Sequence, residues 1–417
     1  MFQISQDFAP PFKLIAPFFI IGAFFYLMSV VYLFTFSVEN FHHLDIKILS
    51  FIHLFLLGFV MMVIFGAMAQ LVPVVLEVGH FAVELFYAIW PLLSIGTLMM
   101  VGGFVYLPAL LPYGGTIVLV SMMVFVFEIF LTMKKVEKFN VVMSSIFISN
   151  TFLFFGIIFG LVMALGYAGV VDVDINALLR SHVFLVIGGY ISITIMGLST
   201  VLLPMFGLSH GFSKKPLYVA LSLMSLAVVL VVISSFIKLS IIEYMAYILA
   251  TISLVVYFYL VYIIYKTRAR KENDIYSKSM IFAYFSMLVA LALAVGYLFT
   301  SQESYLLASA WLFFFGFFGF AITGHMYKIV PFLVWFERYS PLVGKQKVPM
   351  LADMLPKQSS SAQLTFTVFG VLSITLALLL QNEMLIKAGA SFLSFGAVAF
   401  LRTILYMINY KQGLENG

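Results

Sequence analysis

Two histidines lie at related places in otherwise apolar segments of the chain. His53 stands 20 residues before Pro73, and His182 stands 22 residues before Pro204. An imidazole inside hydrocarbon needs a metal or a hydrogen-bond partner, because an unsatisfied polar group is costly there. A haem iron or a copper ion would bind one ring nitrogen. Both histidines are therefore candidate metal ligands, and the alternative is a hydrogen bond to a carbonyl or hydroxyl of a neighbouring helix.

These histidines belong to a pattern that occurs three times, ending at prolines 131 and 127 residues apart. Three recurrences in one register predict a threefold repeated architecture. The paired glycines remove side-chain bulk, so that either a porphyrin plane or another helix can approach closely. Gly58, Gly66 and Gly189 are accordingly candidate cofactor contacts, with helix packing as the alternative. Counting back from Pro73, Pro204 and Pro331, the shared residues are Gly66, Gly197 and Gly324 at 7, Ile64, Ile195 and Ile322 at 9, and Gly58, Gly189 and Gly316 at 15.

The third copy carries a histidine at a different depth. His325 lies 6 residues before Pro331, which places it on the order of 20 Å deeper than His53 at about 1.5 Å per residue. The two cannot share one iron. Lys328 is one turn away, so His325 and Lys328 together could bind a carboxylate, a haem propionate or a lipid phosphate. The alternative is a lysine reaching the membrane edge beside a histidine with a structural hydrogen bond.

The composition is that of an integral membrane protein, with 64% hydrophobic and only 9% charged residues. Bilayer lipid is the expected solvent for so much apolar surface. The chain has no cysteine, which excludes disulfides, thiolate metal sites and iron–sulfur clusters. The segment Met1–Pro11 lacks the features of a removable signal peptide, so we expect the first span to insert uncleaved.

The loops offer a second place for a metal. His42 and His43 adjoin Glu39 and Asp45 in the first outer loop, and such a group could bind copper or zinc. Solvated loop residues without a metal are the alternative. His80 and His210 are expected in inner loops, and Glu128 near the inner end of its span.

Apolar stretches long enough to cross hydrocarbon predict an all-α fold of about twelve transmembrane helices. We expect one transmembrane domain, 1–417, with pseudo-symmetric four-helix units at approximately 12–133, 142–265 and 277–410, in which the repeat-bearing helices are the inner members. A solvated cytoplasmic connection is expected over 337–363 because it is rich in proline and serine. The predicted spans are 12–36, 46–75, 83–107, 112–133, 142–169, 179–207, 216–238, 242–265, 277–300, 304–335, 363–381 and 384–410.

Basic residues are unevenly distributed between alternate loops, and this bias sets the expected orientation. Cytoplasmic loops carry an excess of Lys and Arg, so both termini are expected in the cytoplasm, with the chain in a bacterial inner membrane. The net charge of +5 then reflects topology and anionic lipid, without nucleic acid as a partner. The inner loops hold Lys134, Lys135, Lys138, Lys214, Lys215, Lys266, Arg268, Arg270, Lys271, Lys278, Arg338, Lys345, Lys347 and Lys357, and the outer loops hold Lys47, Arg180, Lys238 and Lys387.

Twelve spans in three four-helix units, with histidines entering even-numbered central helices from the outer side, resemble subunit I of the haem-copper oxidase and nitric oxide reductase superfamily. The stretch from His53 through Gly58 and Gly66 to Pro73 is particularly similar to the second span of that family and to NnrS-type haem membrane proteins. The resemblance implies that His53 ligates a low-spin haem. It also implies that His182 matches a ligand of the active-site copper.

The chain departs from that family where the remaining ligands should be. The tenth span should supply a His-x-His pair, but the aligned places hold Ser309, Ala310 and Trp311. The seventh span should supply two adjacent copper ligands, yet no histidine occurs between Pro216 and Lys238. We therefore predict neither oxygen reduction nor the ordinary nitric oxide reductase reaction.

Three functional hypotheses follow. The first is a haem b protein that transfers electrons or handles nitric oxide or another diatomic gas, without a copper centre. The second is a metal-free transporter or assembly factor for haem, copper or a small lipophilic substrate on the same scaffold. The third is a partner subunit of a respiratory complex, with a cytochrome or quinol as electron partner. A homo-oligomer is compatible with each.

Overall fold

The computed structural model describes residues 8, 10–42, 45–137 and 139–411. Within these residues the chain is all-α, and 12 helices are long and apolar enough to cross a membrane. The predicted fold class, an all-α multi-pass membrane protein, is thereby confirmed. His43, Lys138 and most of the amino-terminal segment assessed for a signal peptide lie outside the described residues.

Nine of these spans have a single long α-helix, and three are composite. The long helices are α1 (Phe12–Tyr32), α4 (Phe86–Val105), α5 (Leu111–Met133), α6 (Val141–Tyr167), α9 (Lys215–Ile237), α10 (Ser240–Lys266), α11 (Ile275–Thr300), α14 (Lys357–Leu380) and α15 (Glu383–Ile408). Several begin at an Asp or Asn whose side chain accepts a hydrogen bond from a first-turn N–H, the usual amino-terminal cap. Asn140 does this for α6, Asp274 for α11 and Asn382 for α15.

The composite spans are the three that carry the repeat, and each contains π-helical turns. The π-helical stretch ends twelve residues before the proline in every copy, and it contains the more distant glycine of the repeat. Such turns are rare and concentrate at functional or strained places in helices. The pieces are α2 (Ile46–Phe55), η4 (Leu56–Met61) and α3 (Met62–Leu76), then α7 (Ile175–Val183), η7 (Phe184–Ser192) and α8 (Ile193–Gly207), then α12 (Glu303–Trp311), η8 (Leu312–Gly319) and α13 (Phe320–Arg338).

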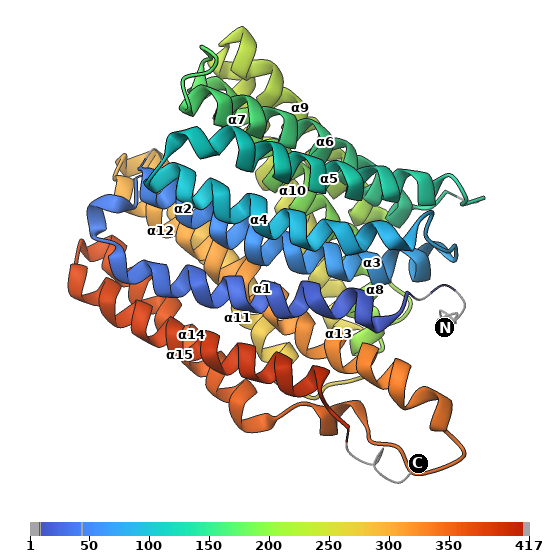
Figure 1. Cartoon of the computed structure of the whole chain (residues 1–417). Coiled ribbons are helices and arrows are strands. Elements are labelled where there is room, and N and C mark those ends of the chain that lie inside the picture. The colour runs from blue at the N-terminus through green and yellow to red at the C-terminus, as the bar shows by residue number, and fades with distance from the viewer. Residues whose placement is uncertain (1–7, 9, 43–44, 138, 412–417) are drawn as a thin grey trace. The chain divides into compact units, whose positions relative to one another are not determined.

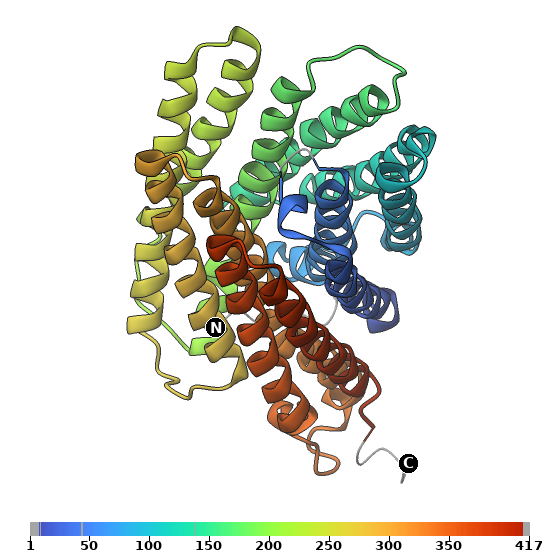
Figure 2. The ribbon, with the colours of Figure 1, turned by 90° about the vertical axis from the view of Figure 1, so that its left-hand side faces the viewer.

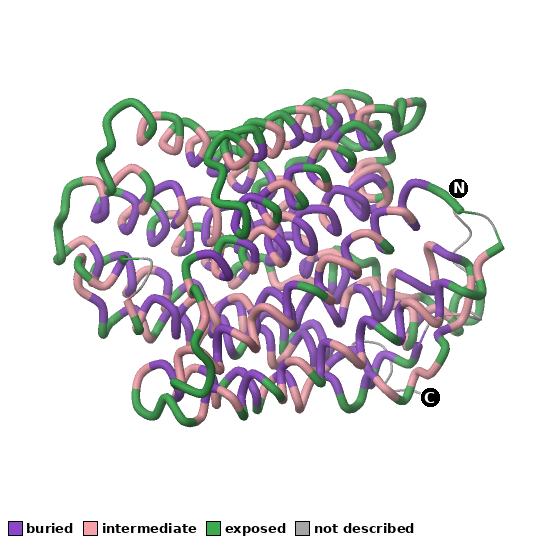
Figure 3. The backbone as a smooth tube through the Cα atoms, turned by 90° about the horizontal axis from the view of Figure 1, so that it is seen from above, coloured by how far each residue is buried: buried purple, intermediate pink, exposed green. Residues whose placement is uncertain are grey.

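Burial separates the composite spans from the others. Their most apolar windows are 78%, 78% and 72% buried, whereas those of the remaining spans lie between 22% and 61%. The repeat-bearing spans are thus the most buried of the twelve, whereas their place as inner members of four-helix units stays a prediction. Buried residues follow the helices and exposed ones dominate the connections (Figure 3).

The chain separates into two compact units. One comprises Leu71–Met99 and Leu107–Lys271 with the amino-terminal residues, and the other comprises Pro10–Gln70, Met100–Tyr106 and Glu272–Gly417. In the first unit α9 and α10 form a hairpin, joined by a hydrogen bond from Ser253 to the carbonyl of Ala220 (Figure 2). In the second, α14 and α15 lie side by side (Figure 1). The division into three four-helix units stays a prediction.

The connection predicted over 337–363 is shorter than expected. Helix α14 begins at Lys357, so the serine run expected in the loop belongs to its first turns. Ser360 is fully buried, and its hydroxyl donates to the carbonyl of Pro356. Hydroxyls that bond to the preceding turn make such a polar sequence compatible with a helix.

Candidate functional site

The more distant glycine of each repeat lies against the helix that precedes it in the chain. A Cβ atom added to Gly58 would lie 2.5 Å from the ring of Phe25 on α1. The same addition at Gly189 would meet Phe152 on α6, and at Gly316 it would meet Ser286 on α11, each at 2.6 Å. These distances are too short for a side chain, so a glycine is required at all three places for helix packing.

The glycine 7 residues before the proline of each repeat also lies against a side chain of the preceding helix. A Cβ on Gly66 would lie 2.6 Å from that of Phe18, and one on Gly324 would lie 2.9 Å from that of Ser279. Gly197 lies against Ser145 in the corresponding way. In each pair of helices the two contacted residues are seven apart. The faces of Gly58, Gly66 and Gly189 are thus occupied by side chains, and their role as cofactor contacts stays a prediction.

His53 lies near the start of the first composite span and is half-buried. Its Nδ1 is 2.7 Å from the carbonyl oxygen of Leu49, one turn earlier on the same helix. Because a carbonyl only accepts hydrogen bonds, Nδ1 carries the proton and the ring lone pair is on Nε2. The imidazole also contacts the ring of Phe104, with centroids 5.0 Å apart. This is the tautomer that metal-ligating histidines commonly use.

His182 has the same tautomer but a different partner. Its Nδ1 donates to the carbonyl of Gly156 on α6, at 2.8 Å, so here the bond joins two helices. Gly160 provides the space for the ring, since a Cβ there would lie 2.9 Å from Cε1 of His182. His53 and His182 belong to different units.

The places aligned with these histidines in the third copy hold Trp311 and Ser309. The indole N–H of Trp311 donates to the carbonyl of Val371 at 3.1 Å, and the hydroxyl of Ser309 donates to that of Ala290 at 2.8 Å. All four aligned side chains therefore donate to a main-chain carbonyl. Trp311 and Ser309 are engaged as donors and do not replace the missing histidine ligands.

Aromatic rings fill the space around Trp311 in the second unit. Phe315 is stacked on Trp311, with centroids 4.3 Å apart, and on Phe55, with centroids 4.1 Å apart. Phe51 is stacked on Phe315 from α2 at 5.4 Å. These flat side chains pack the composite spans 46–76 and 303–338 against one another at this level.

His325 and Lys328 face the start of α11. Lys328 Nζ lies 2.5 Å from Asp274 Oδ2, and His325 Nδ1 donates to the carbonyl of Ala321 at 2.7 Å. The His325 ring also packs edge-on against Tyr276. Burial raises the pKa of Asp274, but hydrogen bonds from Lys328 and from the N–H of Ser277 outweigh it and hold that pKa below its usual value. The carboxylate that binds Lys328 is thus Asp274 of the same chain.

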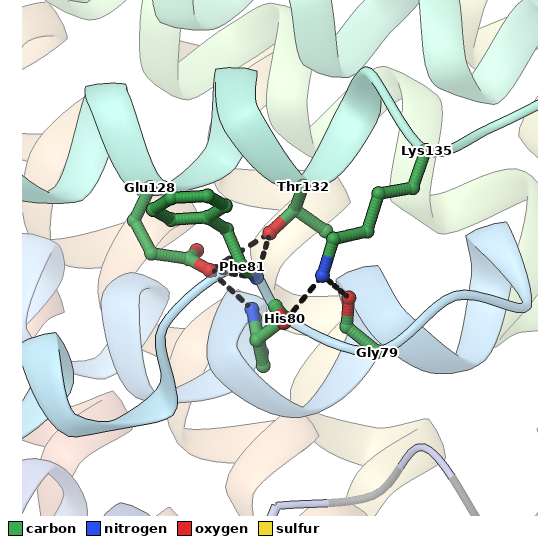
Figure 4. A network of polar contacts seen from close by, with 6 residues as sticks. All are labelled: Gly79, His80, Phe81, Glu128, Thr132 and Lys135. Atoms are coloured by element: carbon green, nitrogen blue, oxygen red, sulfur yellow. Dashed lines mark hydrogen bonds and ion pairs between the residues drawn. The ribbon is translucent and has the colours of Figure 1, made fainter.

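A polar network at His80 was missed by the sequence reasoning (Figure 4). His80 was expected as an ordinary loop residue, but it is only 7% exposed, and its Nδ1 lies 3.0 Å from Oε1 of the fully buried Glu128 on α5. The same oxygen accepts hydrogen bonds from the Phe81 N–H at 3.0 Å and the Thr132 hydroxyl at 2.7 Å. Lys135 reaches the loop as well, through the carbonyls of residues 79 and 80. The only signal in the sequence was a carboxylate inside an apolar span.

Among the described residues, no group of three or more His, Asp or Glu side chains has the arrangement of a metal site. The proposed loop site at His42 and His43 extends beyond those residues, since His43 is outside them. His210 is exposed in its loop, as expected.

Neither the models of known protein families nor curated proteins give a significant match to this chain. The resemblance to oxidase subunit I thus depends on the histidine, glycine and proline positions described above.

Proposed function

We propose that the chain is a haem protein of the bacterial inner membrane, with both termini in the cytoplasm, that binds haem b through His53. In this proposal it transfers electrons or binds a diatomic gas such as nitric oxide, and it does not reduce oxygen. The observation that carries the proposal is the hydrogen bond from His53 Nδ1 to the carbonyl of Leu49. Lipid surrounds the spans, and a cytochrome or quinol would be the electron partner.

The donor chemistry of His53 fits that of a residue that would hold a haem iron. The Leu49 carbonyl fixes both the tautomer and the orientation of the ring, which is the outer contact that ligating histidines typically have. Phe104 packs on the same imidazole and keeps its surroundings apolar. The haem, when bound, would supply a redox-active iron whose potential depends on this ligand and on burial.

The other residues limit the kind of haem site that is compatible with the chain. Trp311 and Ser309 donate their polar hydrogens to carbonyls, so the aligned places do not supply a second strong ligand. With His53 as its only strong protein ligand, a bound haem would supply an iron able to bind a gas reversibly. His182 has equivalent donor chemistry in the other unit and is proposed as a separate ligand, for a second haem or for copper.

The test is a pyridine haemochrome assay with metal analysis on protein purified after growth with added haem. We expect haem b in the wild type, one haem per chain fewer in His53→Ala, and the wild-type amount in His210→Ala, whose histidine is exposed in a loop. His53→Gly supplied with free imidazole should regain the haem band, since the small ligand can occupy the vacated position. Absence of haem from the wild type, or full retention in His53→Ala, would contradict the proposal.

A metal-free transporter or assembly factor is the second candidate, and one observation favours it. The glycine faces that could have admitted a porphyrin are occupied by Phe25 and Phe18, and aromatic rings stack around Trp311. Under this candidate the His53 hydrogen bond is purely structural. Replacing His53 would then lower stability equally with and without added haem, whereas the haem proposal predicts that added haem stabilises only proteins that keep this ligand.

A further inference from the structure

The two carboxylate oxygens of Glu128 differ in the number of hydrogen bonds that they accept. Three donors converge on Oε1: the imidazole of His80, the backbone N–H of Phe81 and the hydroxyl of Thr132, all within 3.0 Å. Oε2 is equally buried but has no hydrogen-bond partner among the described residues. A buried carboxylate oxygen without a donor is costly, so the arrangement is incomplete as it stands.

The charged groups around Glu128 do not complete it. His80 is the only ionisable side chain in the described structure that contacts the carboxylate directly. Lys135 follows on the same helix end, but its Nζ donates to the carbonyls of Gly79 at 3.1 Å and His80 at 2.8 Å. The lysine therefore fastens the loop and leaves Oε2 of Glu128 without a partner.

We propose that Glu128 and His80 form a proton-binding site, in which Oε2 of Glu128 takes up one exchangeable proton. With Glu128 ionised and His80 neutral, the pair carries a charge of −1 in a buried place. A hydronium ion of the solvent supplies the proton: one of its O–H bonds breaks, an O–H bond forms at Oε2, a water molecule is left behind and the pair becomes neutral overall. The proton goes to Oε2 because the three donors already occupy Oε1 and Oε2 has no partner among the described residues.

The site adjoins residues at the surface of the protein. Phe81, whose N–H binds Glu128, has a side chain that is 53% exposed, and Lys135 is exposed at the end of α5. Protonation would weaken Oε1 as an acceptor for its three donors, two of which belong to the loop after α3. The proton occupancy of the pair thus sets how strongly this loop is held to α5.

The experiment is a pH titration of the purified protein in lipid nanodiscs by infrared difference spectroscopy in water and in heavy water. Uptake of a proton by Glu128 produces the C=O stretching band of a buried carboxylic acid, which shifts on deuteration. We expect an amplitude of one carboxyl per chain in the wild type and in Glu137→Gln, a matched control with an exposed carboxylate just beyond the same helix. The band should be lost in Glu128→Gln, which keeps an acceptor oxygen but cannot take the proton.

A second variant keeps the proposal testable if Glu128→Gln does not fold. Thr132→Val removes one of the donors to Oε1 of Glu128 but leaves both Glu128 and His80 in place, so the carboxylic acid band should persist at a frequency shifted from that of the wild type. No buried carboxyl band in the wild type, an unchanged band in Glu128→Gln, or a band at the wild-type frequency in Thr132→Val would each overturn the proposal.

Discussion

Gly58→Ala separates the two uses of the repeated glycines. A Cβ at Gly58 would lie 2.5 Å from Cγ and 2.8 Å from Cβ of Phe25, whereas ordinary contact begins near 3.4 Å. Because Phe25 is only 3% exposed, its rigid base cannot move aside freely. Overpacking of this kind costs about 1–3 kcal/mol, and the better helix propensity of alanine offsets about 0.8–1.0 kcal/mol. We expect a net destabilisation of roughly 0–2 kcal/mol.

Gly319→Ala is the matched control, because Gly319 also lies in a π-helical stretch and its added Cβ would meet nothing closer than 3.8 Å. It gains the same propensity without the overlap. The two variants should therefore differ by about 1–3 kcal/mol, or about 5-fold to 150-fold in the unfolding equilibrium constant. Unfolding in mixed detergent micelles, followed by circular dichroism on protein without haem, measures this difference. Equal stabilities, with haem binding lost only in Gly58→Ala, would refute the packing explanation.

Three further predictions follow from contacts in the second unit. Gly316→Ala should lower stability by about 1–3 kcal/mol relative to Gly319→Ala, and Ser286→Gly in the same chain should restore much of it; additivity of the two changes would contradict direct contact. Asp274→Asn should remove up to about 1 kcal/mol of stability at neutral pH. The pKa of Asp274 is lowered in the folded state, so the stability difference between wild type and Asp274→Asn should be fully present above about pH 4, the usual pKa of a carboxyl group. It should disappear as the pH falls through the lower pKa of the folded state. A stability difference that does not change with pH in denaturation curves would refute the pairing with Lys328. Tyr327→Phe should cost about 1–3 kcal/mol, since the buried glutamine of α14 that accepts its hydrogen bond at 2.9 Å would lose that donor; unfolding midpoints equal to wild type would show that the bond contributes nothing.

The spans were predictable because each depends mainly on local composition. The ends of α5 at Met133 and of α11 at Thr300 agree with the predicted limits, since charged or polar residues follow the apolar stretch directly. The start of α14 was wrong by several residues because its first turns are hydroxyl-rich. Hydropathy cannot detect that such hydroxyls bond within the helix.

The candidate site was only partly predictable because its contacts join distant parts of the chain. His80 and Glu128 are 48 residues apart, and nothing in either segment indicates that the loop folds onto α5. The carbonyl partner of His182 comes from the preceding helix, a contact that depends on which faces meet. The π-helical stretches have no sequence signature of their own, although the glycine spacing that accompanies them was evident.

The three composite spans share one backbone arrangement but differ in the side chain that lies near the amino-terminal end of each span. Imidazole, indole and hydroxyl groups all occur at this position, and each donates a hydrogen bond to a main-chain carbonyl oxygen. The scaffold is thus indifferent to the identity of the group it carries, provided that the group has a hydrogen to give. Evolution could exchange reactive for inert residues there without rebuilding the membrane core, so loss or gain of a ligand in such a protein need leave no mark on its architecture.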